Sequence, residues 1–133
     1  MDYYANMICY TRRLIKQGTI YLNKFPKHEK HGLALQIRNS MYRVYELIVE
    51  GDKRFQKKTT LTNLNIEHEK LRMFFHLAFE LGYFEWKVKS NHIWVEPSTT
   101  EVQRRYETIS NYINELGRMI GGWIKHESLK SKG

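Results

Sequence analysis

The chain has 133 residues, 41% of them hydrophobic, which is enough for one domain with a buried core and favours a globular fold over disorder. Its 22 Lys and Arg outnumber its 14 Asp and Glu, and the net charge of +8 favours a polyanionic partner. No apolar run approaches the ~20 residues that cross a bilayer, and the first residues lack a signal-peptide pattern, so we expect a cytoplasmic protein without membrane contact.

Two helices are predicted in the first half of the chain. The first is expected to run from about Asp2 to a turn at Pro26, where proline ends one helix and starts the next. The second is predicted by apolar residues that step by four, four, three and four, and it should end near Gly51 and Asp52. These apolar residues are Leu33, Ile37, Met41, Val44 and Ile48.

A third helix is predicted after Lys57, Lys58, Thr59 and Thr60, and Gly82 is expected to close it. Its apolar side consists of Leu64, Leu71, Phe74, Phe75, Ala78 and Leu81.

Residues 83–96 break the helical pattern. Trp86 and Val88 alternate with charged residues before a turn at Ser90 and Asn91, and a second β-prone run follows. This pattern predicts a small β-hairpin between the third and fourth helices. Trp86 and Trp94 have two interpretations: they contact a partner, or they fold back over the end of the helices.

The last helix is expected to begin at Ser98, because Ser98 and Glu101 match the spacing of a capping box. Its apolar stripe follows a period of 3.6 residues and is expected to face the core. The stripe contains Val102, Ile109, Ile113, Leu116, Ile120, Trp123 and Ile124.

Glycines lie along one flank of this stripe. Gly117 and Gly121 are costly inside a helix, so we interpret them, with Trp123, as a close-packing surface for another helix or another subunit. A frayed helix end is the alternative. Four amphipathic helices with short connections predict an all-α, antiparallel up-down four-helix bundle, formed by residues 1–133 as one domain.

Four segments together resemble a known family. They are Lys24-Phe25-Pro26-Lys27, Leu35-Gln36-Ile37-Arg38-Asn39, Glu46-Leu47-Ile48-Val49-Glu50 and Gly117-Arg118-Met119-Ile120-Gly121-Gly122-Trp123-Ile124. In order and spacing they resemble the accessory variability determinant (Avd) of diversity-generating retroelements. The same superfamily includes the four-helix proteins encoded in intervening sequences of bacterial ribosomal RNA.

The resemblance implies a homopentamer that binds the reverse transcriptase of its element and contacts template RNA and cDNA. Error-prone copying and mutagenic retrohoming would depend on it, and the protein itself would be no enzyme. A structural oligomer that binds only protein, or an intervening-sequence protein of unknown function, are the alternatives.

Basic residues are concentrated around the second helix and on the last one. We interpret ten of them as candidate phosphate ligands, because nucleic-acid binding needs several cations on a shared surface. They are Lys24, Lys27, Lys30, Arg38, Lys53, Arg54, Lys57, Lys58, Arg118 and Lys125.

Each of these candidates can also be interpreted as a solvated charge, since helical proteins routinely carry exposed Lys and Arg. Arg54 and Arg43 fall near Glu46 and Glu50 on an outward face where they can form ion pairs, and Arg38 can anchor a helix contact. Tyr42 and Tyr106, each beside an arginine, are candidates for base stacking but are more typical of core-edge residues.

Signals of catalysis and metal binding are weak. Cys9 cannot form an internal disulfide, has no base beside it in the sequence and is interpreted as a packing residue. His28 and His31 are three residues apart, but no further ligand completes a metal site. We therefore expect no catalytic residue, no metal and no cofactor.

Overall fold

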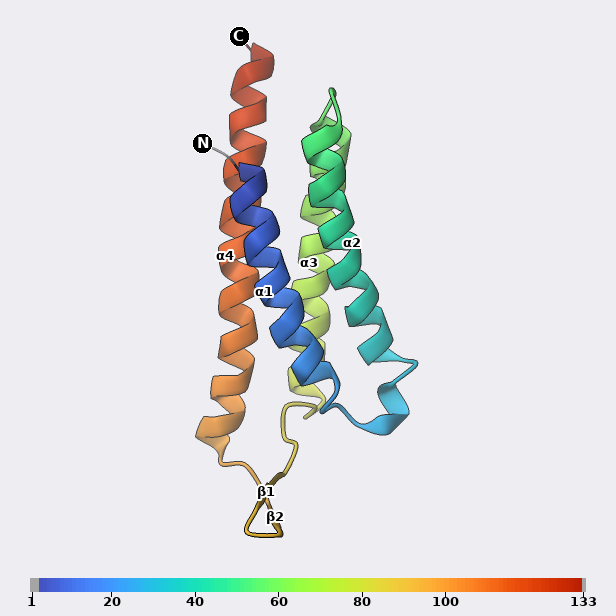
Figure 1. Cartoon of the computed structure of the whole chain (residues 1–133), viewed down its shortest axis with the longest axis vertical. Helices are drawn as coiled ribbons and strands as arrows, with labels where there is room; N and C mark the ends of the chain where they lie inside the picture. The colour runs from blue at the N-terminus through green and yellow to red at the C-terminus, as the bar shows by residue number, and fades with distance from the viewer. Residues whose placement is uncertain (1–2, 133) are drawn as a thin grey trace.

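The computed structural model describes residues 3–132 and contains four long helices and one β-hairpin (Figure 1). The elements are α1 (Tyr3–Leu22), a short 3-10 turn η1 (Lys27–Glu29), α2 (Leu33–Lys53), α3 (Lys58–Glu80), β1 (Val88–Ser90), β2 (Ile93–Val95) and α4 (Thr99–Lys132).

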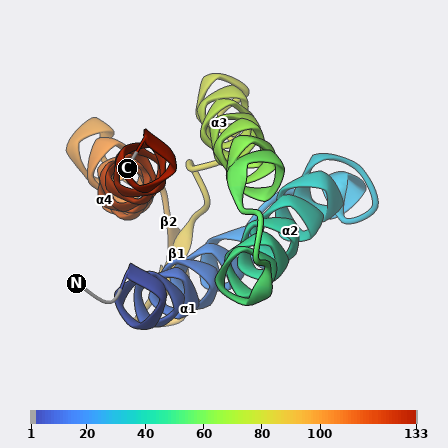
Figure 2. The same ribbon diagram turned by 90° about the horizontal axis from the view of Figure 1, so that it is seen from above.

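The helices form an antiparallel bundle. Each packs against its neighbour in the chain and α4 closes against α1, so four helices surround one core (Figure 2). The connection between α2 and α3 lies at one end, called here the loop end, and the hairpin projects from the other, the hairpin end (Figure 1). The predicted four-helix bundle with a hairpin between its third and fourth helices is confirmed.

The predicted apolar stripes form most of this core. Ile37, Met41, Leu64, Leu71 and Phe75 are almost completely buried, and so is most of the predicted stripe of α4. The prediction that Leu81 belongs to the apolar side of α3 is wrong, since α3 ends at Glu80 and Leu81 is 50% exposed in the following turn.

Helix ends follow the predicted residues with one difference, at Pro26. Gly82, at φ +79°, ends α3 as predicted, and the Ser98 Oγ accepts the Glu101 amide at 3.1 Å, which is one half of the capping box. Pro26 starts only η1, because the Glu29 carboxylate instead accepts the Leu33 amide at 3.0 Å and caps α2. The predicted start at Asp2 lies outside the described residues.

The segment that leads into the hairpin, residues 83–87, is held against the bundle by aromatic packing and by one buried arginine. Phe84 is fully buried, and Trp86 packs on Tyr21 and Phe84 with ring centroids 5.3 and 5.9 Å away. The Arg105 guanidinium donates to the carbonyls of Phe84 and Trp86 at 2.9 and 3.0 Å and lies 4.2 Å from the Trp86 ring centroid. Trp86 therefore folds back over the bundle, whereas Trp94 remains 63% exposed.

The two flanking glycines differ. A Cβ at Gly117 would lie 2.7 Å from Cε1 of His68 on α3, so Gly117 does make the predicted close approach. At Gly121 a Cβ would meet no atom of the described chain within 4 Å, so Gly121 makes no close approach to another helix of this chain, and its packing against another subunit stays a prediction. Trp123 is buried, and its ring lies over Gly51 of α2.

Alanine substitutions should separate these glycines. Gly117→Ala is expected to lower the free energy of unfolding by about 1–2 kcal/mol, because the new methyl group overlaps the His68 ring. Gly121→Ala should raise it by about 0.5–1 kcal/mol through helix propensity. Urea titrations of both variants measure the two changes, and a stabilised Gly117→Ala protein would contradict the packing described.

His68 connects α3 to α4 beneath Gly117. It is almost completely buried, and its Nε2 lies 2.7 Å from the Ile113 carbonyl oxygen, a contact that requires the proton on Nε2. Burial lowers the pKa of His68 below its usual value near 6.5. The folded protein therefore holds this imidazole neutral under conditions where the unfolded chain already begins to bind a proton.

This difference predicts acid sensitivity. Below about pH 6.5 the unfolded chain binds more protons at His68, so the contribution to stability present above that pH is lost as the pH falls. Thermal melts between pH 7.5 and 5.5 should show a smaller loss in His68→Gln, whose amide still donates to Ile113 but does not titrate. Equal losses in both proteins would refute a role for His68.

Candidate nucleic-acid interface

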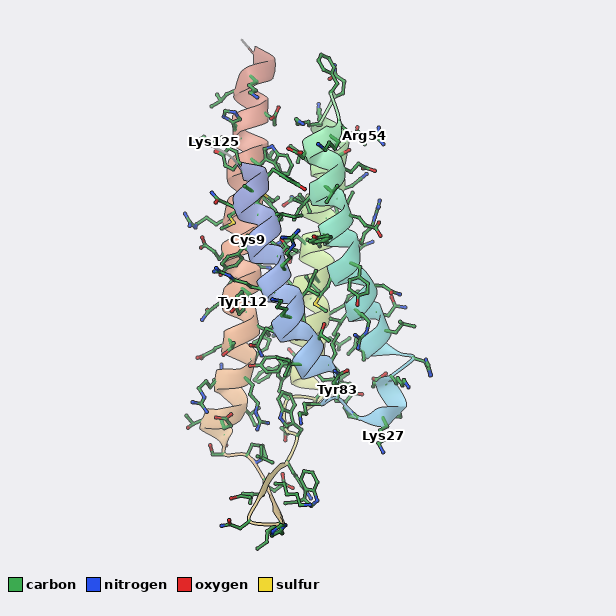
Figure 3. All side chains as sticks on the ribbon, viewed as in Figure 1. Cys9, Lys27, Arg54, Tyr83, Tyr112 and Lys125 are labelled. Atoms are coloured by element: carbon green, nitrogen blue, oxygen red, sulfur yellow. The ribbon has the colours of Figure 1, made fainter. Side chains whose placement is uncertain are left out.

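The ten predicted cations do not form one surface. Lys53, Arg54, Lys57 and Lys58 lie at the loop end, and Lys125 lies toward the same end on α4 (Figure 3). Lys24, Lys27 and Lys30 lie in and around η1 near the hairpin end. Since the bundle is more than twenty residues long, at ~1.5 Å per residue, the two groups cannot contact the same short stretch of nucleic acid.

Three cations at the loop end point into solvent. The side chains of Lys53 and Arg54 are 79% and 59% exposed, and Lys58 is exposed too. Their ion pairs are loose, at 3.8 Å from Lys53 to Asp52 and 3.7 Å from Arg54 to Glu50. Exposed pairs of this kind contribute about 0–1 kcal/mol, so a phosphate can replace the carboxylate at little cost.

Lys57 has a different role from the predicted one. Its Nζ donates to the carbonyl oxygens of Gly51, Asp52 and Arg54 at 2.6, 3.1 and 2.9 Å. These three bonds use all donors of the ammonium group and satisfy carbonyls at the C-terminus of α2. We therefore remove Lys57 from the candidate phosphate ligands and assign it to the fold.

Lys57→Met should test this assignment. The variant keeps the aliphatic stem but loses the three hydrogen bonds, so we expect the free energy of unfolding to fall by about 1–3 kcal/mol. The neighbouring Lys58→Met is the control and should change it by less than about 0.5 kcal/mol. Equal stabilities of the two variants in urea titrations would contradict a capping role for Lys57.

The loop end also carries an aromatic side chain that sequence reasoning missed. Phe55, between Arg54 and Gln56, is 95% exposed. A single aromatic residue in a short polar loop gives no periodic signal, and only its position among Arg54, Lys57 and Lys58 marks it in the sequence.

At the hairpin end, Lys24, Lys27 and Lys30 are all exposed. The one carboxylate within η1, that of Glu29, accepts the Tyr83 hydroxyl at 2.6 Å as well as the Leu33 amide. The Tyr83 hydrogen bond, followed by the Leu33 amide, lowers the pKa of Glu29. Because the Glu29 carboxylate is held by these two donors, the three lysines form a second basic surface.

Of the three remaining candidates, Arg118 and Arg38 are less available than the lysines. Arg118 donates through Nε to Glu115 at 3.0 Å, and this pair lowers the pKa of Glu115 and raises that of Arg118. Lys125 is exposed, whereas Arg38 is half-buried on α2. Tyr106 stacks on Phe79 with ring centroids 4.3 Å apart, so it is a packing residue, as the simpler interpretation held.

The sequence was compared with family models and with curated proteins. A model of the bAvd-like family matches residues 7–127. The chain belongs to the bAvd-like family. This is the family of Avd, a non-catalytic accessory protein of diversity-generating retroelements, and the predicted resemblance is confirmed. The search of curated protein sequences found no match.

Two further expectations have structural outcomes in this bAvd-like chain. Cys9 lies on the exposed side of α1, so its interpretation as a packing residue is wrong within the chain (Figure 3). His28 faces Tyr83, with 3.5 Å between its Nε2 and the hydroxyl, and nowhere in residues 3–132 do three or more His, Cys, Asp or Glu side chains form a group suited to a metal ion.

In the part that the structure describes, none of the helices combines the length and the apolar character needed to cross a bilayer.

Proposed function

We propose that this chain assists the reverse transcriptase of a diversity-generating retroelement, binding both the enzyme and its template RNA and cDNA in the cytoplasm so that mutagenic retrohoming proceeds. Membership of the bAvd-like family over residues 7–127 carries this proposal. The chain contributes binding surfaces to such a complex, and the polymerase contributes the chemistry.

The loop end is our proposed nucleic-acid surface. Lys53, Arg54 and Lys58 are three exposed cations at one end of the bundle, and the carboxylates that pair with Lys53 and Arg54 hold them weakly. Each phosphate that they neutralise releases a counterion, which favours binding without regard to base sequence. Lys24, Lys27 and Lys30 are a second contact for a strand long enough to reach the hairpin end.

Self-association into a ring of five subunits is part of the proposal. Ile66, Met73 and Leu77 of α3 are 51%, 53% and 45% exposed and follow one another along the helix at intervals of seven and four residues. This spacing places them on one face, and an exposed apolar face of this kind favours an interface between subunits. Light scattering at micromolar concentration should give several times the chain mass of 16.1 kDa, and a strict monomer would refute the ring.

A second function, as a structural protein that binds only protein, is favoured by the hairpin. Val88, Ile93, Trp94 and Val95 are all about half or more exposed, although a two-stranded hairpin usually needs packing to be stable. Contact with another protein would cover these side chains.

Co-elution with the reverse transcriptase distinguishes the two functions. We expect the purified chain to elute with the enzyme of its element and with template RNA in one complex during size-exclusion chromatography. A complex that contains the enzyme but never takes up RNA would favour the protein-binding alternative. Separate elution of all three components would refute both the association and the proposed function.

A further inference from the structure

Phe55 is the most exposed of the large hydrophobic side chains in the described part of the chain, at 95%. It lies in the connection of four residues, 54–57, that joins α2 to α3. Phenylalanine is usually buried, since exposing its ring to water forgoes about 1.5–3 kcal/mol. An aromatic ring so fully exposed on a short loop therefore suggests a ligand that covers it.

Hydrogen bonds hold the residues on both sides of Phe55. On one side, the Arg54 amide donates to the Glu50 carbonyl at 2.9 Å and continues the hydrogen bonding of α2. On the other, the Lys57 ammonium is bonded to three carbonyls of the same helix end, and the Leu61 amide donates to the Lys57 carbonyl at 2.9 Å. Because hydrogen bonds hold the chain on both sides of residues 55–56, less backbone entropy is lost when Phe55 binds a ligand.

The surroundings of Phe55 favour a nucleic acid over a protein. All residues from Lys53 to Thr59 except Phe55 are polar or charged, so the loop presents no second apolar side chain to a protein partner. A nucleobase needs only one flat face, and the exposed Lys53, Arg54 and Lys58 supply cations for the phosphates on either side.

We infer that Phe55 stacks on an unpaired base of single-stranded RNA or DNA while Lys53, Arg54 and Lys58 contact the flanking phosphates. The inference rests on the proposed function and adds strand selectivity to it. Bases inside a duplex are already stacked on both faces, so the ring contributes to single-strand binding only. Either polynucleotide fits, because every base has an aromatic face.

Three substitutions of Phe55 test the inference by fluorescence anisotropy with the whole chain. The probes are a single-stranded RNA and a single-stranded DNA of twelve nucleotides, and a blunt duplex of the same sequence. Phe55→Ala and Phe55→Leu should both weaken single-strand binding about tenfold, because neither offers a flat ring. Phe55→Trp should keep or improve it, and duplex binding should change less than about twofold in all three.

Two controls accompany these variants. Ile20→Ala removes an exposed apolar side chain from α1, outside the loop, and should leave binding of all three probes unchanged. The slope of log affinity against log salt should be the same for Phe55→Ala and the unmodified chain, since no phosphate contact is lost.

The outcomes separate this inference from the proposed function. Unchanged single-strand binding by Phe55→Ala overturns the inference, and so does Phe55→Leu binding as well as the unmodified chain, which would mark a merely apolar contact. If replacing Lys53, Arg54 and Lys58 still weakens binding in that case, the nucleic-acid surface stands without the stacking. A Phe55→Ala protein that binds every oligonucleotide normally but changes its oligomer mass would place Phe55 in a subunit contact and overturn the inference as well.

Discussion

Replacing Lys53, Arg54 and Lys58 together with glutamine is expected to weaken binding to RNA and DNA by about tenfold to a hundredfold at low salt. Each lost cation removes one neutralised phosphate, so the slope of log affinity against log salt should fall by about 2–3 per subunit. The effect should not depend on base sequence. Fluorescence anisotropy from low to moderate salt measures both quantities.

This variant leaves Lys57 unchanged, because the Lys57 ammonium holds three carbonyls of α2 and its loss would disturb the fold. The matched control replaces Lys24, Lys27 and Lys30 with glutamine, which removes the same charge from the hairpin end. We expect a smaller loss of affinity from the control on short oligonucleotides. An equal or larger loss would move the nucleic-acid surface to the hairpin end.

Arg105→Met is expected to lower the free energy of unfolding by about 3 kcal/mol. The Arg105 side chain is only 6% exposed, and its guanidinium satisfies the Phe84 and Trp86 carbonyls while its Nε pairs with Glu101 at 3.3 Å. Removing one partner of a buried charged network leaves the other groups without hydrogen bonds. The packing of Phe84 and Trp86 against the bundle should loosen in consequence.

Urea titration gives the stability, and the fluorescence of Trp86 reports the local loosening. The adjacent Arg104→Met is the control, since the Arg104 side chain is 73% exposed and its pair with Glu101 should contribute less than about 1 kcal/mol. A change as small for Arg105→Met as for Arg104→Met would show that the hairpin end does not depend on the buried guanidinium.

The fold was largely predictable because its signals are local. The steps of three and four residues from Leu33 to Ile48 fix one face of α2, and this face is the one that the core buries. Gly82 and Ser98 end and begin helices by backbone chemistry that involves only a few neighbouring residues. Leu81 continues the apolar periodicity of α3 past the end of that helix, so the pattern alone placed Leu81 wrongly on the buried side.

The packing of the glycines was only half predictable. Periodicity places Gly117 and Gly121 on one flank of α4, but it does not say where α3 comes closest. His68 fills the space beside Gly117, and nothing in the described chain fills the space beside Gly121. That difference depends on the tilt of two helices and on one side chain of the partner helix.

The sequence predicted the excess of positive charge at the candidate site, but it did not predict which side chains point into solvent. Arg54, Lys57 and Lys58 are alike in the sequence, yet the fold turns only the Lys57 ammonium back onto the end of α2. Phe55 was missed for a related reason, since hydrophobic residues are expected to be buried and exposure on a loop follows only from the folded backbone.

Reverse transcription with purified components tests the central proposal most directly. The enzyme and template RNA of the retroelement would be combined with the unmodified chain, with the Lys53, Arg54 and Lys58 glutamine variant, or with neither. We expect error-prone cDNA in quantity only with the unmodified chain, and clearly less with the variant. Equal yield and equal error rate of cDNA in all three reactions would contradict the proposed accessory function.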